Sequence, residues 1–209
     1  MRQTSKIAAY GLAVALLAIP SLVGPAARAQ GFSSAPADVK AGAYVLDPSH
    51  GKITWSVSHF GFSTYVGQFT GVAGTLKLDP KPEGSALDVT IDTASVGTLN
   101  PALDTHLKSP DFLDAAKFPQ ATFKATSVKL TSAKTADIAG DLTLHGVTKP
   151  VVVQATFNQA GVGPADHKYT VGFAGAAVIK RSDFGIKTYV PYVSDEVTLQ
   201  IEAEFKAAS

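Results

Sequence analysis

Apolar and polar residues alternate along most of the chain. Segment 52–59 shows this best, because Ile53, Trp55, Val57 and His59 fall on one side of an extended backbone and the polar residues between them fall on the other. Many strands with one apolar and one polar face indicate an all-β domain with a closed or stacked antiparallel sheet. A closed barrel of about eight strands has room either for packed side chains or for one elongated small molecule. The segments expected to be strands are 44–47, 52–60, 66–79, 86–93, 119–131, 136–145, 150–158, 168–180 and 194–206.

Segment 100–118 loses the alternation. Asn100 is a suitable helix cap, and Pro101 suits the first helical position. We therefore predict one or two short helical turns that lie across an end or a side of the barrel. The positions expected on their buried side are Leu103, Leu107 and Phe112.

The first 29 residues have the features of a secretory signal peptide. Arg2 and Lys6 precede an apolar run over 7–19, and a small-x-small cleavage site lies at 27–29. Residues 30–42 are small and polar and are expected to form a flexible leader. The domain itself is expected over 43–209, as a single unit with a sizeable core.

The composition of the mature protein argues against several classes of partner. Removal of residues 1–29 takes away three basic and no acidic residues, so the formal net charge changes from +1 to −2. A chain of this charge with scattered lysines is not expected to bind nucleic acid. No later apolar run is long enough to span a bilayer, so stable membrane insertion is not expected. The chain has no cysteine, which excludes disulfides and a lipid-attachment cysteine.

Motifs that resemble catalytic or metal sites lack their necessary context. Asp183-Phe184-Gly185 has the letters of a kinase magnesium motif, but the chain has no glycine-rich phosphate loop to accompany it. We interpret Arg181 and Asp183 as an ion pair or a turn anchor. The five histidines show no metal-ligand spacing beyond the pair Asp104-x-His106, so neither a metal nor a cofactor is expected. The predicted inward faces carry few titratable groups, so we do not expect an enzyme.

Short motifs follow one another in order along nearly the whole mature chain. They are Tyr44-x-Leu-Asp47, Ile53-x-Trp-x-Val-x-His59-x-Gly61, Gly67-x-Phe69, Ile91-Asp-Thr-Ala-Ser-Val96, Asp104-x-His-Leu-Lys-Ser109-x-Asp-Phe112, Phe118-Pro119-x-Ala-x-Phe123, Gly140-Asp-Leu-Thr-Leu-His-Gly-Val-Thr-Lys-Pro150, Arg181-Ser-Asp-Phe-Gly185 and Asp195-Glu-Val197. In this order they resemble the YceI-like family. The resemblance implies an extended lipocalin-like antiparallel β-barrel, exported to the bacterial periplasm. It also implies an apolar cavity that holds a polyisoprenoid or a similar amphiphilic lipid, such as an isoprenoid quinone or its precursor.

The candidate ligand-binding residues are apolar and aromatic side chains of the expected inward faces and of the irregular segment. For each of them the alternative is that it only fills the core, and for His59 that it is a hydrogen-bonded structural histidine. Three functions follow: a lipid carrier, an enzyme acting on such a lipid inside the cavity, or a ligand-free stress protein with a filled barrel. The sequence leaves open whether the chain forms a homodimer. The candidates are Trp55, Val57, His59, Phe69, Phe112, Phe118, Phe123, Leu142, Leu144 and Phe184.

Overall fold

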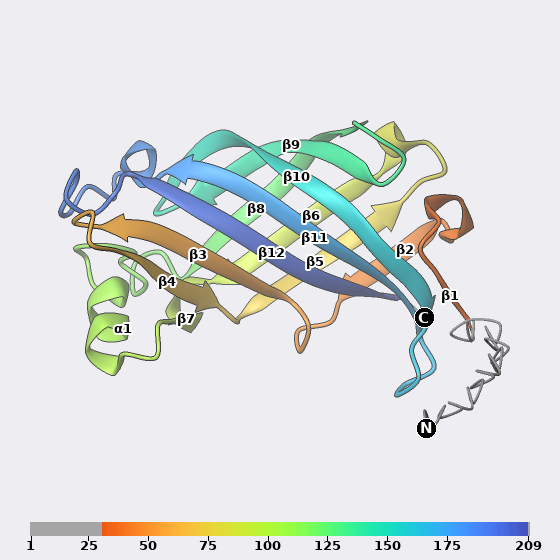
Figure 1. The fold of residues 1–209 in the computed structure, drawn as a ribbon, viewed down its shortest axis with the longest axis horizontal. Coiled ribbons are helices and arrows are strands. Elements are labelled where there is room, and N and C mark those ends of the chain that lie inside the picture. The colour runs from red at the N-terminus through yellow and green to blue at the C-terminus, as the bar shows by residue number, and fades with distance from the viewer. Residues whose placement is uncertain (1–30, 209) are drawn as a thin grey trace, which may run out of the picture. The chain divides into compact units, whose positions relative to one another are not determined.

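The computed structural model of the protein describes residues 31–208, so the expected signal peptide at 1–29 lies outside the described residues. Within them the chain forms twelve strands, one α-helix and four short 3₁₀ turns (Figure 1). The helix is α1 (Pro101–Lys108), and the 3₁₀ turns are η1 (Pro36–Asp38), η2 (Pro82–Gly84), η3 (Thr93–Ser95) and η4 (Arg181–Phe184). The strands are β1 (Phe32–Ser33), β2 (Gly42–Leu46), β3 (Lys52–His59), β4 (Ser63–Phe69), β5 (Val72–Leu78), β6 (Ala86–Asp92), β7 (Val96–Gly97), β8 (Gln120–Leu130), β9 (Thr135–Leu144), β10 (Val147–Val162), β11 (Tyr169–Lys180) and β12 (Glu196–Ala207).

Eight strands close into an antiparallel barrel, as the alternation predicts. The ring runs β10-β9-β8-β6-β5-β2-β12-β11 and returns to β10. Every pair in the ring is antiparallel, so one face of each strand is turned inward and the other outward.

Strand β12 pairs with two different strands along its length. Its last residues, Phe205–Ala207, pair with β2, whereas 198–202 pair with β3. From β3 the sheet continues through β4 to the short strand β7, and α1 follows at the same end of the domain (Figure 1). The barrel therefore has one half closed by β2 and β5, and another half walled by β3, β4, β7 and α1.

Segment 66–79, expected as one strand, is two strands that pair with different neighbours. Strand β4 pairs with β3 and β7, while β5 pairs with β2 and β6. Between them Gly71 lies so near η3 that an added Cβ would be 2.9 Å from the Cβ atoms of Asp92 and Ser95. The close backbone approach at this glycine interrupts the strand, a feature that the periodicity does not reveal.

Residues before β2 carry two short elements in the segment that we expect to be a flexible leader. Strand β1 pairs antiparallel with the end of β10, through Phe32 opposite Gly161 and Ser33 opposite Ala160. The turn η1 follows, and the backbone NH of Lys40 donates to the hydroxyl of Tyr169. The leader is thus connected to the barrel at these points.

Helix α1 forms where the sequence predicts it. The Asn100 side chain accepts a hydrogen bond from Leu103 N, and Pro101 occupies the first turn. Leu103, Leu107 and Phe112 are half-buried. The helix is amphipathic, and its apolar side faces the interior of the half walled by β3 and β4.

The two halves of the barrel are packed differently. The half closed by β2 and β5 is filled by a dense apolar cluster. Its central members are Tyr44, Leu46, Leu76, Val171 and Phe205, and all of them are buried. Close-packed interiors of this kind contain few voids, and the apolar cavity that inward side chains line lies in the other half.

Candidate functional site

A cavity of about 280 Å³, open to the surface at one end, lies in the half walled by β3, β4 and α1. Its floor includes Ile91 and Ala121, next to the filled half, and its far end reaches the exposed side chains of His59 and Tyr189. Most of the lining is aliphatic or aromatic. Its volume is close to the lower limit of about 300 Å³ that is usual for small-molecule sites.

Most sequence-predicted site residues line this cavity. Their side chains converge from β3, β4, β9 and the segment after α1, because inward positions of a strand recur at every second residue. Those that line it are Trp55, Val57, His59, Phe69, Phe112, Leu142 and Leu144. Their role as ligand contacts stays a prediction.

Three predicted site residues do not line the cavity. Phe123 is buried beside Leu142, where its ring fills the space left by Gly140. Phe184, the last residue of η4, is 1% exposed and packs in the same cluster. Phe118 packs against the His145 ring, with a centroid distance of 4.6 Å. These side chains pack the wall and the β9–β10 turn, so we do not retain them as candidate ligand contacts.

Several lining residues are not among those that the sequence predicts. The pattern indicates that Leu103 and Leu107 of α1 are buried, but not that they face a ligand site. Ile186, Tyr189 and Val193 lie in a loop without periodicity, so no pattern identifies them. Tyr65 lies two residues before the glycine–phenylalanine motif on β4, and the alternation extended backward along this strand identifies it. The remaining ones are Ile53, Ile91, Thr93, Val96, His106, Leu113, Ala121, Ile179, Arg181, Val197 and Leu199.

Arg181 is the most unusual group at the cavity wall. It is only 6% exposed, and no carboxylate within residues 31–208 lies in ion-pair distance of it. Its guanidinium donates to the carbonyl oxygens of Ile186, Thr188, Val193 and Ser194, at 2.8–3.3 Å. Burial lowers the pKa of Arg181, and Asp195 opposes that effect. Of the two interpretations from the sequence, the turn anchor is confirmed; Asp183 takes no part.

Trp55 combines a cavity-facing ring with a buried, unpaired donor. The residue is 8% exposed and lines the cavity, yet its Nε1 has no hydrogen-bond partner in the described part of the chain. Because Nε1 is itself covered, a ligand in the cavity does not reach it without movement of the ring. The unpaired donor is therefore a cost to stability of about 1–3 kcal/mol.

His59 lies at the mouth of the cavity. Its ring packs edge-on against Phe60, with centroids 4.7 Å apart, and 6.3 Å from the Tyr65 ring. Among residues 31–208 the structure gives this ring no hydrogen-bond partner. No hydrogen bond within the described chain thus fixes the ring, and a contact between His59 and a ligand head group stays a prediction.

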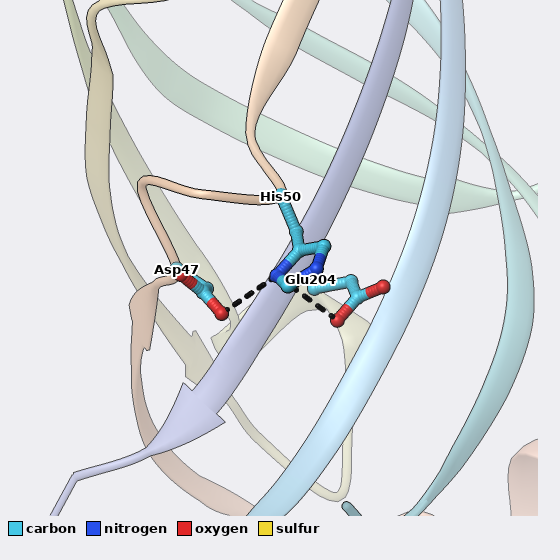
Figure 2. A group of neighbouring side chains, drawn as sticks. All are labelled: Asp47, His50 and Glu204. Carbon is cyan, nitrogen blue, oxygen red and sulfur yellow. Dashed lines mark hydrogen bonds and ion pairs between the residues drawn. The ribbon is translucent and has the colours of Figure 1, made fainter. Parts of the chain in front are cut away.

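A polar cluster lies outside the cavity, where β12 changes neighbour from β2 to β3. Figure 2 shows Asp47 and Glu204 on either side of the His50 ring, with His50 Nδ1 2.8 Å from Asp47 Oδ2 and 3.8 Å from Glu204 Oε2. One nitrogen and two carboxylates at this spacing could hold a metal ion. However, Lys206 Nζ lies 2.7 Å from the same Asp47 oxygen and 2.6 Å from Asp166. The lysine occupies the carboxylate oxygen that a metal ion would need, so we interpret the cluster as an ion-pair network and do not assign a metal to it.

The pKa shifts in this network follow from its hydrogen bonds. The bonds from Lys206 and then His50 hold the pKa of Asp47 well below 3.8. The bond to Asp47, followed by the charge of Glu204, raises the pKa of His50 above 6.5. The two carboxylates that Lys206 contacts raise the pKa of its ammonium, Asp166 more than Asp47. The network links the 163–168 turn to the junction between β2 and β3.

Asp104 and His106 do not converge as a ligand pair. The Asp104 carboxylate accepts hydrogen bonds from the backbone and the hydroxyl of Thr98, at 2.7 and 2.6 Å. His106 Nε2 instead lies 3.2 Å from Asp111. Asp104 thus stabilises the start of α1, and the pair has no shared site.

Within residues 31–208, no helix combines the length and the apolarity that a membrane span requires.

Comparisons with known proteins agree with this architecture. Residues 44–205 match the YceI-like domain. A UPF0312 protein of Pseudomonas savastanoi pv. phaseolicola is 44% identical over 166 residues, which cover 78% of this chain and 84% of the relative. The crystal structure of the Campylobacter jejuni YCEI protein is 34% identical, with a TM-score of 0.64 over 71% of this chain and 88% of that one. A polyisoprenoid-binding domain from Saccharophagus degradans, implicated in plant cell wall breakdown, shares the fold at 14% identity, with a TM-score of 0.63 over 81% of this chain and 100% of that one.

Proposed function

Because this chain belongs to the YceI-like family, we propose that it is a carrier that holds a polyisoprenoid or a similar amphiphilic lipid in the open half of its barrel. The observation that carries this proposal is the apolar cavity between β3, β4 and α1, which reaches the surface at one end. The S. degradans domain, which has the same fold, is described as binding polyisoprenoids. An isoprenoid quinone or its precursor is the ligand class that we favour.

The energetics suit an elongated apolar ligand. Each buried methylene contributes about 0.8 kcal/mol, so one five-carbon isoprene unit contributes roughly 4 kcal/mol before ordering costs. A few units inside the cavity are therefore sufficient for tight binding without a strong polar contact. Such a site selects for length and width of the ligand more than for a functional group.

The polar side chains at the cavity argue for binding over catalysis. Thr93 donates to the Phe118 carbonyl, and Arg181 donates to four carbonyl oxygens. His106 contacts Asp111. Each of these groups is engaged with the protein itself, and they do not converge on one point as a general acid and base do. An enzyme acting on an isoprenoid lipid is the second candidate, since His59 and Tyr65 remain at the mouth.

We further propose that residues 1–29 direct export to the periplasm and are removed there. The charged start, the apolar run and the small-x-small site support this step. N-terminal sequencing of the mature protein from a periplasmic fraction is expected to begin at Gln30. Recovery of the chain with Met1 still attached would contradict it.

The test of the carrier is lipid retention by the mature protein purified from its own periplasm. Native mass spectrometry is expected to show a bound mass that organic solvent extracts and that tandem spectra identify as an isoprenoid. It also reports whether the protein is a monomer or a homodimer. Protein without lipid would favour the filled stress protein, and a chemically altered lipid after incubation would favour the enzyme.

Two variants separate cavity occupancy from general damage. Val57→Trp adds bulk to the cavity wall, whereas Val178→Trp adds the same residue on the outward face of β11, where Val178 is 59% exposed. We expect Val57→Trp to lose most of the lipid and Val178→Trp to retain it. Equal retention in both variants would place the ligand elsewhere.

A further inference from the structure

Four aromatic side chains protrude at the end of the domain where the cavity opens. Phe60 and Phe62 lie in the β3–β4 turn, and Tyr189 and Tyr192 lie in the loop between η4 and β12. They are 47%, 91%, 53% and 67% exposed, respectively. We call these four residues the mouth rim. Large aromatics exposed together usually mark an interaction surface.

The two parts of the mouth rim form one cluster that continues into the cavity wall. The Phe60 ring stacks on the Tyr192 ring, with centroids 5.8 Å apart and planes at 18°. Phe60 N also donates to the Tyr192 carbonyl at 2.7 Å. Tyr189 lines the cavity and lies 6.3 Å from the Phe112 ring. A molecule that leaves the cavity at this end therefore passes the mouth rim.

The backbone holds these side chains outward at a cost. Phe60 and Tyr189 have φ angles of 54° and 62°, in the left-handed region that bulky residues rarely occupy. The Arg181 guanidinium fixes the loop that carries the tyrosines through its four carbonyl contacts. Strained backbone that presents apolar side chains to water indicates a use for them outside the monomer.

We propose that the mouth rim docks the protein on a lipid bilayer, so that the cavity opens directly onto the membrane interface. The proposal rests on the proposed lipid ligand, which resides in a bilayer and would expose the apolar surface of its tail to water if it left the cavity through solvent. Tyrosine favours the headgroup region, where its apolar ring and its hydroxyl are both accommodated, and phenylalanine buries its ring at the boundary to the acyl chains. Contact at the mouth lets the tail pass from cavity to bilayer without this exposure.

The area of the mouth rim favours a bilayer over a second copy of the chain. Fully buried aromatic side chains cover about 150–250 Å² each, so the exposed fractions of these four amount to about 400–650 Å². A stable protein–protein interface needs about 800 Å² per partner. Insertion of a few aromatic side chains has no such requirement, because shallow, reversible binding is sufficient for delivery.

The test is flotation of lipid-stripped mature protein with phosphatidylcholine vesicles. Phe62→Ser/Tyr192→Ser removes two rim side chains that do not line the cavity. The matched control is Val45→Ser/Leu130→Ser. Val45 lies in β2, on the filled half, and is 50% exposed. Leu130 is the last residue of β8, at the opposite end of the barrel, and is 55% exposed. We expect wild type and control to float and the rim variant to partition at least about tenfold more weakly. Phe62→Ser alone, at a 91% exposed position, covers the case in which the double variant misfolds.

Transfer kinetics and lipid retention distinguish this inference from the carrier proposal. The rim variant is expected to retain co-purified lipid as wild type does, and to deliver it to acceptor vesicles about tenfold more slowly. Flotation of the rim variants equal to wild type, or failure of wild type to float, would overturn membrane docking. A wild-type dimer that the rim variant converts to monomer would also overturn it, in favour of a second copy. Docking without any retained lipid would instead overturn the carrier proposal and leave the docking surface standing.

Discussion

The indole of Trp55 lies directly over the backbone of Gly67, its partner across strands β3 and β4. A Cβ at Gly67 would overlap Trp55 Cζ2 and lie 2.5 Å from Cε2. The ring thus occupies the place of a missing side chain on β4. The absence of a side chain at Gly67 sets how far the indole projects into the cavity.

Gly67→Ala is therefore expected to displace the Trp55 ring toward the cavity. Overpacking of this kind costs about 1–3 kcal/mol. Denaturant melts measure the loss, and lipid retention is expected to fall with it. Gly97→Ala in β7 is the control, because an added Cβ there meets nothing within 4 Å. Equal stability of the two variants would show that Trp55 has another resting position.

Replacement of Trp55 separates wall contacts from core filling. A fully packed tryptophan costs about 3–5 kcal/mol when changed to alanine. Because one side of this ring already borders the cavity, we expect less than about 3 kcal/mol for Trp55→Ala in lipid-stripped protein, with a clear loss of lipid retention. Trp55→Phe also removes the unpaired Nε1 donor, so its cost is expected to stay within about 1 kcal/mol. Unchanged stability and retention in Trp55→Ala would remove the residue from the interior.

Arg181→Lys tests the anchor of the loop that carries Tyr189 and Tyr192. A lysine ammonium keeps the charge but lacks the planar fork that reaches four carbonyl oxygens. We expect a loss of about 2–4 kcal/mol in denaturant melts and faster hydrogen exchange over residues 186–194. Lys180→Gln, at the neighbouring exposed position, is the control. If hydrogen exchange over residues 186–194 is the same in Arg181→Lys and wild type, the guanidinium does not anchor this loop.

Stability is expected to depend on pH through Asp47 and His50. The lowered pKa of Asp47 stabilises the fold above about pH 3.8, and this contribution is lost as the pH falls through the folded value. The raised pKa of His50 stabilises it below about pH 6.5, and this contribution is lost as the pH rises through the folded value. The network is therefore strongest between these two limits. Melts at about pH 3, 5 and 8 are expected to show that Asp47→Asn weakens both dependences. His50→Gln is expected to remove the dependence at higher pH and to leave most of the one at lower pH, because Lys206 has the larger effect on the pKa of Asp47. Parallel pH profiles for wild type and Asp47→Asn would show that the network does not control stability.

Affinity is expected to depend on the length of the lipid tail. Each added isoprene unit should tighten binding by roughly tenfold to a thousandfold until the cavity is full, since only part of the gross burial energy survives ordering. His59→Ala at the mouth is expected to cost no more than about 1.5 kcal/mol, the scale of one hydrogen bond. Titration of lipid-stripped wild type and His59→Ala with prenyl compounds that share a head group measures the dependence on tail length and the contribution of His59. If affinity does not depend on tail length, or if His59→Ala does not bind, the head group dominates binding. The proposal of an enzyme acting on the lipid would then be favoured over the carrier.

Local features of the sequence predict the strands and the helix. Alternation determines which side of β3 faces inward, so the sequence alone places Trp55, Val57 and His59 on one face of this strand. The Asn100 cap and Pro101 determine the start of α1, because both act through the backbone of their own turn. These features depend on neighbours in the chain, which is why a local pattern contains them.

Only the tertiary structure decided which inward residues line a cavity. Inward residues at both ends of the barrel have the same periodicity, yet Tyr44 and Phe205 fill one half whereas Trp55 and Leu199 border open space in the other. The difference arises because β12 exchanges β2 for β3 as its neighbour, and because α1 rather than a further strand covers the open half. The mouth rim likewise depends on contacts between distant segments, because Phe60 of the β3–β4 turn stacks on Tyr192, which lies in a loop without periodicity. Such contacts are set by the packing of strands far apart in the chain, so no local pattern reports them.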